Sequence, residues 1–153
     1  MKKQIFILSL FLIFLGCYAQ KIKLNEANVQ HWTGGVCCIS GDNYTIQLEI
    51  ADTLNFIVID TIWIGNKFYI ENGDKQFTAE KLISEGKTIY NIKVSESTNT
   101  KNKGYPEMEV VEKQSSTYPP NYNGQACVYY YLKNKRQIIE IDSFIQLPRL
   151  AYP

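Results

Sequence analysis

Histidine and methionine are almost absent from this sequence. The only histidine is His31, and Met108 is the only methionine beyond the first residue. Histidine is the usual general base and a frequent metal ligand, so such chemistry would have to be built on His31. The motifs G-x-S-x-G, G-x-x-x-x-G-K-[ST] and G-x-G-x-x-G are missing as well. We therefore identify no hydrolase elbow and no phosphate cradle of these kinds, and we expect neither catalytic residues nor a cofactor.

The chain also lacks an excess of charge of either sign. It has 16 lysines and arginines against 15 aspartates and glutamates. Domains that bind nucleic acid carry a basic patch, because they must neutralise phosphates. The densest basic run, residues 133–136 (KNKR), stands between two strand-like segments and is typical of a solvated hairpin tip. We therefore expect no nucleic-acid partner.

Long apolar runs are missing except at the N-terminus. There Lys2 and Lys3 precede an apolar stretch at 5–15, and small residues follow it. This is the pattern of a secretory signal peptide, and the stretch is shorter than the roughly 20 residues of a transmembrane helix. The sequence predicts a signal peptide over 1–19 and one exported domain over 20–153, periplasmic or extracellular and without a transmembrane segment.

A lipoprotein is the alternative interpretation of the leader. Gly16 stands directly before Cys17, as at sites where a bacterial lipoprotein is cut and its cysteine receives lipid. Phe14 and Leu15 fit that pattern less well. The stretch CYAQ after the core IFILSLF resembles leaders of small exported bacterial proteins, which implies export and no particular activity. In this alternative the protein is anchored to the cell envelope through Cys17.

Alternation of apolar and polar residues, the signature of half-buried strands, is frequent after the leader. In residues 44–50 the apolar side chains occupy alternate positions: Tyr44, Ile46, Leu48 and Ile50. Residues 55–65 are apolar on both faces and β-branched, which predicts either a central strand covered on both sides or one strand with a bend near Asp60.

Turn signals separate these segments. Asn72-Gly73 is typical of a two-residue hairpin turn, and pairing around it sets Phe68 opposite Phe77. Residues 79–86 are compatible with one short helical turn ending at a glycine.

A second hairpin is expected at the KNKR run. A turn centred on Asn134-Lys135 pairs Val128 with Ile141 and Tyr130 with Ile139. Val128 and Tyr130 then face the core, and the intervening side chains face the other way. Cys127, Tyr129, Tyr131 and Ile138 could form a second packed face there.

These segments predict an all-β fold. About eight short antiparallel strands would form a single-domain β-sandwich or a partly open barrel. Long loops are expected near 95–106 and 114–125, on either side of a short strand.

Three cysteines remain after the leader: Cys37, Cys38 and Cys127. Exported chains favour disulfides, and adjacent residues of a strand point to opposite faces, so only one of the neighbouring pair can face Cys127. We predict one disulfide, Cys38–Cys127, with Cys37–Cys127 as the alternative and one thiol left over.

A site built on His31, Cys37 and Cys38 is the alternative to a structural role for these residues. With Cys127 they have the ligand types of zinc, but adjacent cysteines rarely chelate one ion, so we expect no metal. A thiol enzyme would need His31 as its base, and no hydrolase signature surrounds it. Two of Asp42, Asp52, Asp60 and Asp142 could converge as a carboxylate pair for glycoside hydrolysis. Three of these acids, Asp52, Asp60 and Asp142, stand at strand ends or bends, where acids commonly cap turns.

Aromatic residues are the remaining candidates for contact with a partner. Four stand in turn-like or polar segments: Trp32, Tyr105, Tyr118 and Tyr122. Rigid aromatic side chains supply contact area at low entropic cost. The sequence therefore favours a non-enzymatic binding or cell-envelope accessory protein that meets a protein or glycan partner through aromatic loops. The alternatives are a periplasmic enzyme inhibitor and the metal- or thiol-dependent enzyme centred on His31.

Overall fold

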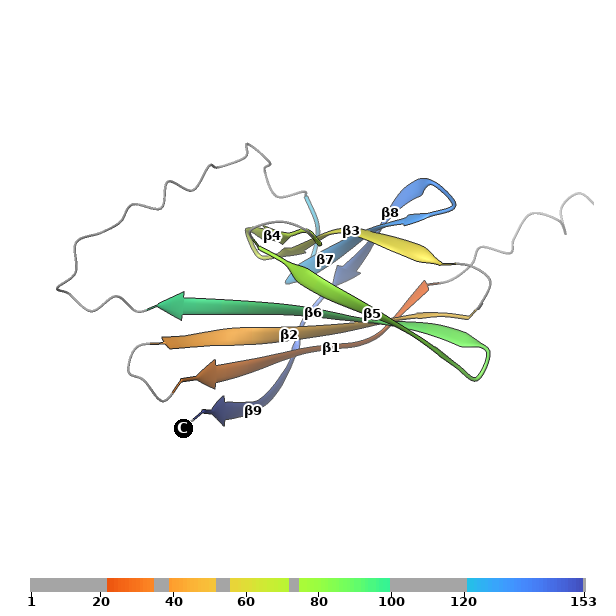
Figure 1. Cartoon of the computed structure of the whole chain (residues 1–153). Coiled ribbons are helices and arrows are strands. Elements are labelled where there is room, and N and C mark those ends of the chain that lie inside the picture. The colour runs from red at the N-terminus through yellow and green to blue at the C-terminus, as the bar shows by residue number, and fades with distance from the viewer. Residues whose placement is uncertain (1–21, 35–38, 52–55, 72–74, 100–120, 153) are drawn as a thin grey trace, which may run out of the picture.

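The computed structural model describes residues 22–34, 39–51, 56–71, 75–99 and 121–152. In this part of the chain all regular structure is β, as predicted. The strands are β1 (Ile22–Thr33), β2 (Ile39–Ile50), β3 (Ile57–Ile64), β4 (Lys67–Tyr69), β5 (Phe77–Ser84), β6 (Lys87–Asn99), β7 (Ala126–Leu132), β8 (Lys135–Ile141) and β9 (Ile145–Ala151). They form two sheets that share one core and do not close into a barrel (Figure 1).

The larger sheet has five strands in the order β5-β6-β2-β1-β9. Its central strands are long, and in Figure 1 β1, β2 and β6 extend to the left beyond the smaller sheet. β9 lies parallel to β1, with Asn28 opposite Ile145. The nine strands of the described residues agree with the expected number of about eight, and the β1–β9 pair is the one departure from the expected antiparallel pairing. After β8 the chain crosses from the smaller sheet to the larger one, where β9 lies beside β1 and runs in the same direction.

The smaller sheet has the order β4-β3-β7-β8, with all neighbours antiparallel. Its inner face packs against the larger sheet, and Ile46, Leu48 and Ile50 are completely buried between them. This confirms the face predicted from residues 44–50. The register of β3 against β7 shifts between Ile59 and Thr61, which agrees with the alternative of a bend near Asp60. Val58 is 54% exposed, so β3 is not covered on both sides.

The strand pairing predicted around Asn72-Gly73 was wrong, although residues 72–74 themselves lie outside the described part of the chain. Phe68 pairs with Trp63 in the smaller sheet, and Phe77 pairs with Val94 in the larger one. The backbone N–H of Ile70 still donates to the Lys75 carbonyl at 3.1 Å, so the chain does turn back locally. It then crosses between sheets, because Phe77 is buried in the core whereas Phe68 lies on the outer face.

The helical turn predicted for residues 79–86 was also wrong. These residues complete β5 and its two-residue turn into β6. Glu85 and Gly86 have φ angles of 50° and 75°, so both lie in the left-handed region. Glycine favours that region both after a helix and in a hairpin turn, and the signal was therefore misassigned.

The hairpin between β7 and β8 forms two residues out of the predicted register. Its turn residues are Lys133 and Asn134, with φ angles of 50° and 62°, and Val128 pairs with Ile139. A shift of two residues keeps every side chain on its predicted face, since the period of a strand is two. Val128 and Tyr130 are accordingly buried in the core.

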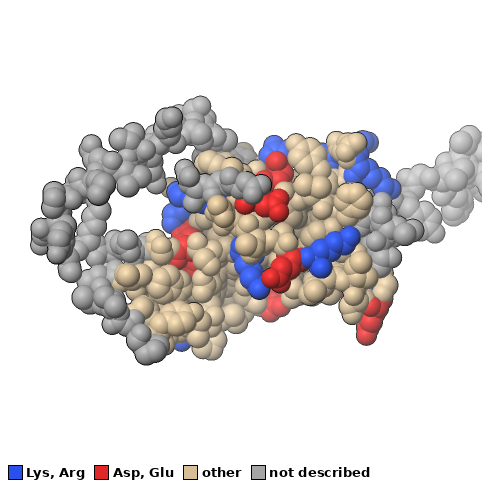
Figure 2. All heavy atoms as spheres, viewed as in Figure 1, with Lys and Arg blue, Asp and Glu red and all other residues tan. Residues whose placement is uncertain are grey.

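The predicted loop at 95–106 begins later than expected, because β6 continues to Asn99. The rest of that loop, most of the loop at 114–125, the short strand between them and the leader lie outside the described residues. Within the described ranges no helix is long and apolar enough to cross a membrane. Basic and acidic side chains are interspersed on the face shown in Figure 2, as the balanced charge predicts.

Candidate functional site

The inner face of the larger sheet changes from apolar to polar near one end. The last row of the core across β1, β2 and β6 consists of Val29, Tyr44 and Val94. Two residues further along each strand, the next row consists of His31, Asp42 and Glu96. Side chains directly opposite on paired strands are neighbours, so at this end of the sheet the imidazole of β1 lies between the edge strand β9 and the two carboxylates of β2 and β6.

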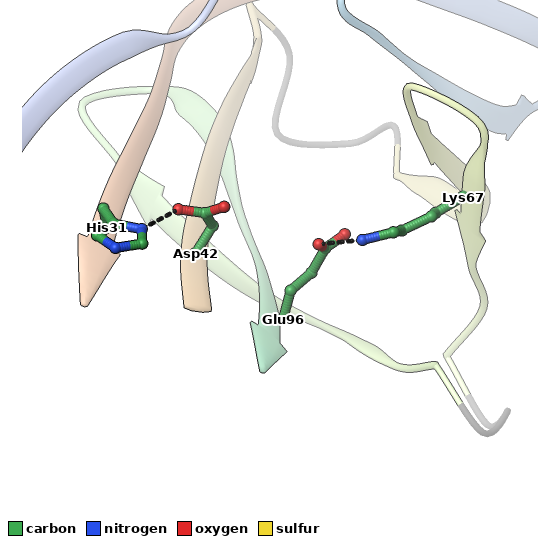
Figure 3. A network of polar contacts seen from close by, with 4 residues as sticks. All are labelled: His31, Asp42, Lys67 and Glu96. Atoms are coloured by element: carbon green, nitrogen blue, oxygen red, sulfur yellow. Dashed lines mark hydrogen bonds and ion pairs between the residues drawn. The ribbon is translucent and has the colours of Figure 1, made fainter. Parts of the chain in front are cut away.

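Each carboxylate of this row has a partner (Figure 3). His31 Nδ1 lies 3.0 Å from Asp42 Oδ1, and the Lys67 ammonium donates to Glu96 Oε2 at 2.6 Å. Lys67 belongs to β4 in the smaller sheet, so its ion pair joins the two sheets at this end. His31 and Asp42 remain partly solvent-accessible, with 44% and 37% of their side chains exposed.

An open cleft of about 620 Å³ lies at this end, between the two sheets. It is lined by Val29, His31, Asp42, Tyr44, Ile64, Gly65, Gly124, Gln125, Phe144 and Gln146. The rings of Tyr44 and Phe144 meet edge to face with centroids 5.1 Å apart. The cleft thus combines an aromatic pair with a few polar side chains, a combination typical of small-molecule sites.

The pKa of the Tyr44 hydroxyl reflects the burial and the charges in the cleft. Burial raises the pKa of Tyr44 to about 12, and the negative charges of Glu96 and Asp42 add to the effect. The phenol is therefore neutral at physiological pH. The two carboxylates also give this end of the sheet a negative potential.

A second hollow, of about 310 Å³, lies on the opposite face of the same sheet. Trp32 follows His31 in β1, so its side chain points to the outer face. The hollow is lined by Trp32, Asn43, Ser95, Glu96, Ser97 and Tyr152. Trp32 and Tyr152 meet nearly at right angles, with centroids 6.1 Å apart.

Gly41 sets the position of the Trp32 indole. It lies opposite Trp32 on β2, and a Cβ atom there would come within 2.8 Å of indole atoms Cε2 and Cζ2. It would also lie 1.8 Å from the Glu96 carbonyl oxygen. Only glycine lets the ring lie this close to the strand, so this glycine serves a close approach and not a turn.

The aromatic contact residues predicted from the sequence are not gathered in one place. Trp32 is in the larger sheet beside Tyr152. Tyr122 precedes β7 in the smaller sheet, where its hydroxyl donates to the Gly65 carbonyl at 2.7 Å. Tyr105 and Tyr118 lie outside the described residues.

Cys127 is a fully buried free thiol. It pairs with Trp63 on the outer face of the smaller sheet, and burial raises its thiol pKa to about 11. Its predicted disulfide partners, Cys37 and Cys38, and the lipidation candidate Cys17 fall outside the described ranges. The structure thus shows no bridge at Cys127, and the disulfide stays a prediction that thiol counting tests.

The described residues contain no group of three histidine, cysteine, aspartate or glutamate side chains placed to hold a metal ion. His31 bonds to Asp42 instead. Of the other acids considered as carboxylate pairs, Asp60 accepts from Arg136 at 2.7 Å in the smaller sheet, Asp142 follows β8, and Asp52 is not described.

Sequence reasoning found Trp32 and His31 but missed most of their neighbours. The missed residues are Gly41, Asn43, Ser95, Ser97, Lys67, Glu96, Tyr44 and Tyr152. Their positions follow from strand pairing at long range, which no local pattern encodes. The only available signal was the early segment HWT, whose alternation puts His31 and Trp32 on opposite faces.

Comparison with known proteins gives no relative: no family model matches the chain, and neither a curated protein nor a solved structure is significantly similar.

Proposed function

We propose that this chain is an exported, non-enzymatic binding module that takes a neutral glycan in the hollow at Trp32. The observation that carries the proposal is the half-exposed indole of Trp32, which lies directly over Gly41 with Tyr152 at its edge. An apolar ring fixed on an outer sheet face, with space beside it, offers contact area without an ordering cost.

The chemistry of the hollow favours a sugar over a charged ligand. Asn43, Ser95 and Ser97 supply neutral donors and acceptors, which match the hydroxyl groups around a sugar ring. The two aromatic rings match the apolar C–H faces of the sugar. Among the described residues Glu96 is the one charged residue that lines the hollow, and its carboxylate lies on the opposite, inner face, where it pairs with Lys67.

The leader supports the location that this proposal needs. A cationic start and a short apolar stretch predict export through residues 1–19, and glycans are found in the periplasm and outside the cell. Anchoring through Cys17 would leave the same domain exposed in the envelope.

Native affinity electrophoresis in gels that contain laminarin, galactomannan or xyloglucan tests the proposal. We expect at least one polysaccharide to retard the protein and Trp32→Ala to weaken that retardation at least about tenfold, the effect of a central aromatic contact. Tyr152→Ala should weaken it as well, and this exposed residue near the chain end can be removed with little risk to folding.

Tyr131→Ala is the matched control, because it removes a tyrosine that is 39% exposed on the smaller sheet. It should leave the retardation unchanged. Equal migration of the wild-type protein in all gels, or full retardation of a folded Trp32→Ala variant, would overturn the proposal.

A further inference from the structure

We propose that the cleft at the open end of the sandwich is a second binding site, selective for an organic cation with a primary ammonium group. The cleft lies on the inner face of the larger sheet, whereas Trp32 points to the outer face. The proposal therefore goes beyond the glycan site and stands without it.

The charges around the cleft favour a cation. Among the residues that the structure describes, Asp42 is the only carboxylate that lines the cleft, and it is 37% exposed, so a ligand can reach it. The neighbouring Glu96 adds a second negative charge, which the Lys67 ammonium offsets at 2.6 Å. Asp42, Glu96 and Lys67 together carry one net negative charge at this end of the sheet.

Aromatic rings at the same place provide the second element of cation recognition. Tyr44 and Phe144 line the cleft beside Asp42, and an ammonium group is attracted to the face of such rings. Phe144 is held in place, since its backbone N–H donates to Gln125 Oε1 at 3.0 Å. An ammonium that donates to Asp42 would thus meet a positioned ring.

Polar groups complete a site of suitable size. Gln125 and Gln146 line the cleft and can accept further N–H bonds through their amide oxygens. Its volume of about 620 Å³ falls in the range of small-molecule pockets. Among the described residues no lysine or arginine lines it. Asp42 contacts His31 Nδ1 through Oδ1 at 3.0 Å, so a ligand ammonium would share this carboxylate with the imidazole.

The ammonium could belong to a free amine or to a lysine side chain of a partner protein. Titration of the ¹⁵N-labelled protein with cadaverine and with Nα-acetyl-lysine amide distinguishes these sources, and 1,5-pentanediol is the neutral control. We expect amide shifts at residues that line the cleft with the ammonium probes and none with the diol. The tighter of the two ammonium probes identifies the source.

Two variants of opposite effect make the proposal falsifiable. Asp42→Asn should weaken ammonium binding at least about fivefold, a change typical of losing one partly exposed charge pair. Lys67→Met releases the Glu96 charge and should strengthen the binding instead. A purely structural role of these residues would not produce changes in opposite directions.

Asp60→Asn is the matched control, because it removes the same charge from the smaller sheet, away from the cleft. It should leave ammonium binding unchanged. Equal shifts with the diol, no shifts at the cleft with either amine, or the same loss in Asp42→Asn and Asp60→Asn would overturn the proposal.

Discussion

At the scale of single residues, the end of the larger sheet depends on one glycine and one tyrosine. Gly41 allows the Trp32 indole to lie on the strand, and Tyr44 marks the boundary between the core and the cleft. Both positions are defined by their cross-strand neighbours. The chemistry of each can therefore be tested with single substitutions.

Replacing Gly41 with alanine should destabilise the protein by about 1–3 kcal/mol, the usual cost of forcing atoms into occupied space. The new Cβ would meet the Glu96 carbonyl at 1.8 Å, which is backbone and cannot rotate away. Urea unfolding measures the free energy. Gly34→Ala is the control, since its Cβ would find ordinary contacts at 3.6 Å or more. Equal stability of the two variants would contradict the close approach at Gly41.

The raised pKa of Tyr44 predicts a loss of stability at alkaline pH. Its pKa is about 12 in the folded protein against 10.0 for the free side chain. Above pH 10 the unfolded chain releases this proton while the folded chain retains it, so the free energy of unfolding falls as pH rises from 10 to 12. Tyr44→Phe should show a smaller fall in urea unfolding at pH 9 and pH 11. An identical pH dependence in the variant would refute the assignment.

At the scale of elements, alternation in the sequence predicted which faces are buried, but not which strands pair. Residues 44–50 and β7 face the core as expected, because the period of two is a local property. The strand pairing around residues 72–73 and the segment 79–86 were mispredicted, because both depend on burial against residues distant in the sequence. Phe77 is buried in the larger sheet, where it pairs with Val94. The burial of this side chain outweighs the local preference for a hairpin at Asn72-Gly73.

The turn between β7 and β8 provides a prediction at this scale. Asn134 has a φ of 62°, a conformation that asparagine and glycine adopt more easily than alanine. Asn134→Ala should cost about 1 kcal/mol, and Asn134→Gly should be nearly neutral or stabilising. Chemical denaturation gives both values. If the alanine variant were as stable as the glycine variant, the turn would have to form elsewhere in the KNKR run.

At the scale of the whole molecule, two sheets of unequal length leave a polar end on the larger one. The core ends at Val29 and Val94, and beyond it the inner face carries His31 and Asp42 while the outer face carries Trp32. The fold class was predictable from alternation and turn signals. The presence of one candidate site on each face of the larger sheet was not predictable. It depends on the strand order β6-β2-β1 and on β9, which adds parallel to β1.

The predicted disulfide is also a property of the whole chain, because it would join the early segment at Cys37 and Cys38 to β7. Thiol counting in denaturant, on the mature protein without reductant, tests it. One free thiol per chain is expected with the bridge to Cys127. Three free thiols would show that all cysteines are reduced and that Cys127 is held in place by packing alone.

The central claim is that Trp32 is the contact residue of a binding protein, and its indole signal tests this most directly. The chain has two tryptophans, and Trp63 is only 4% exposed whereas Trp32 lies in the open hollow. In a ¹⁵N–¹H spectrum each indole N–H gives one peak. On titration with oligosaccharides of laminarin, galactomannan or xyloglucan, the Trp32 peak should shift with at least one series while the Trp63 peak stays in place. If the Trp32 peak does not move with any of them, the claim is contradicted.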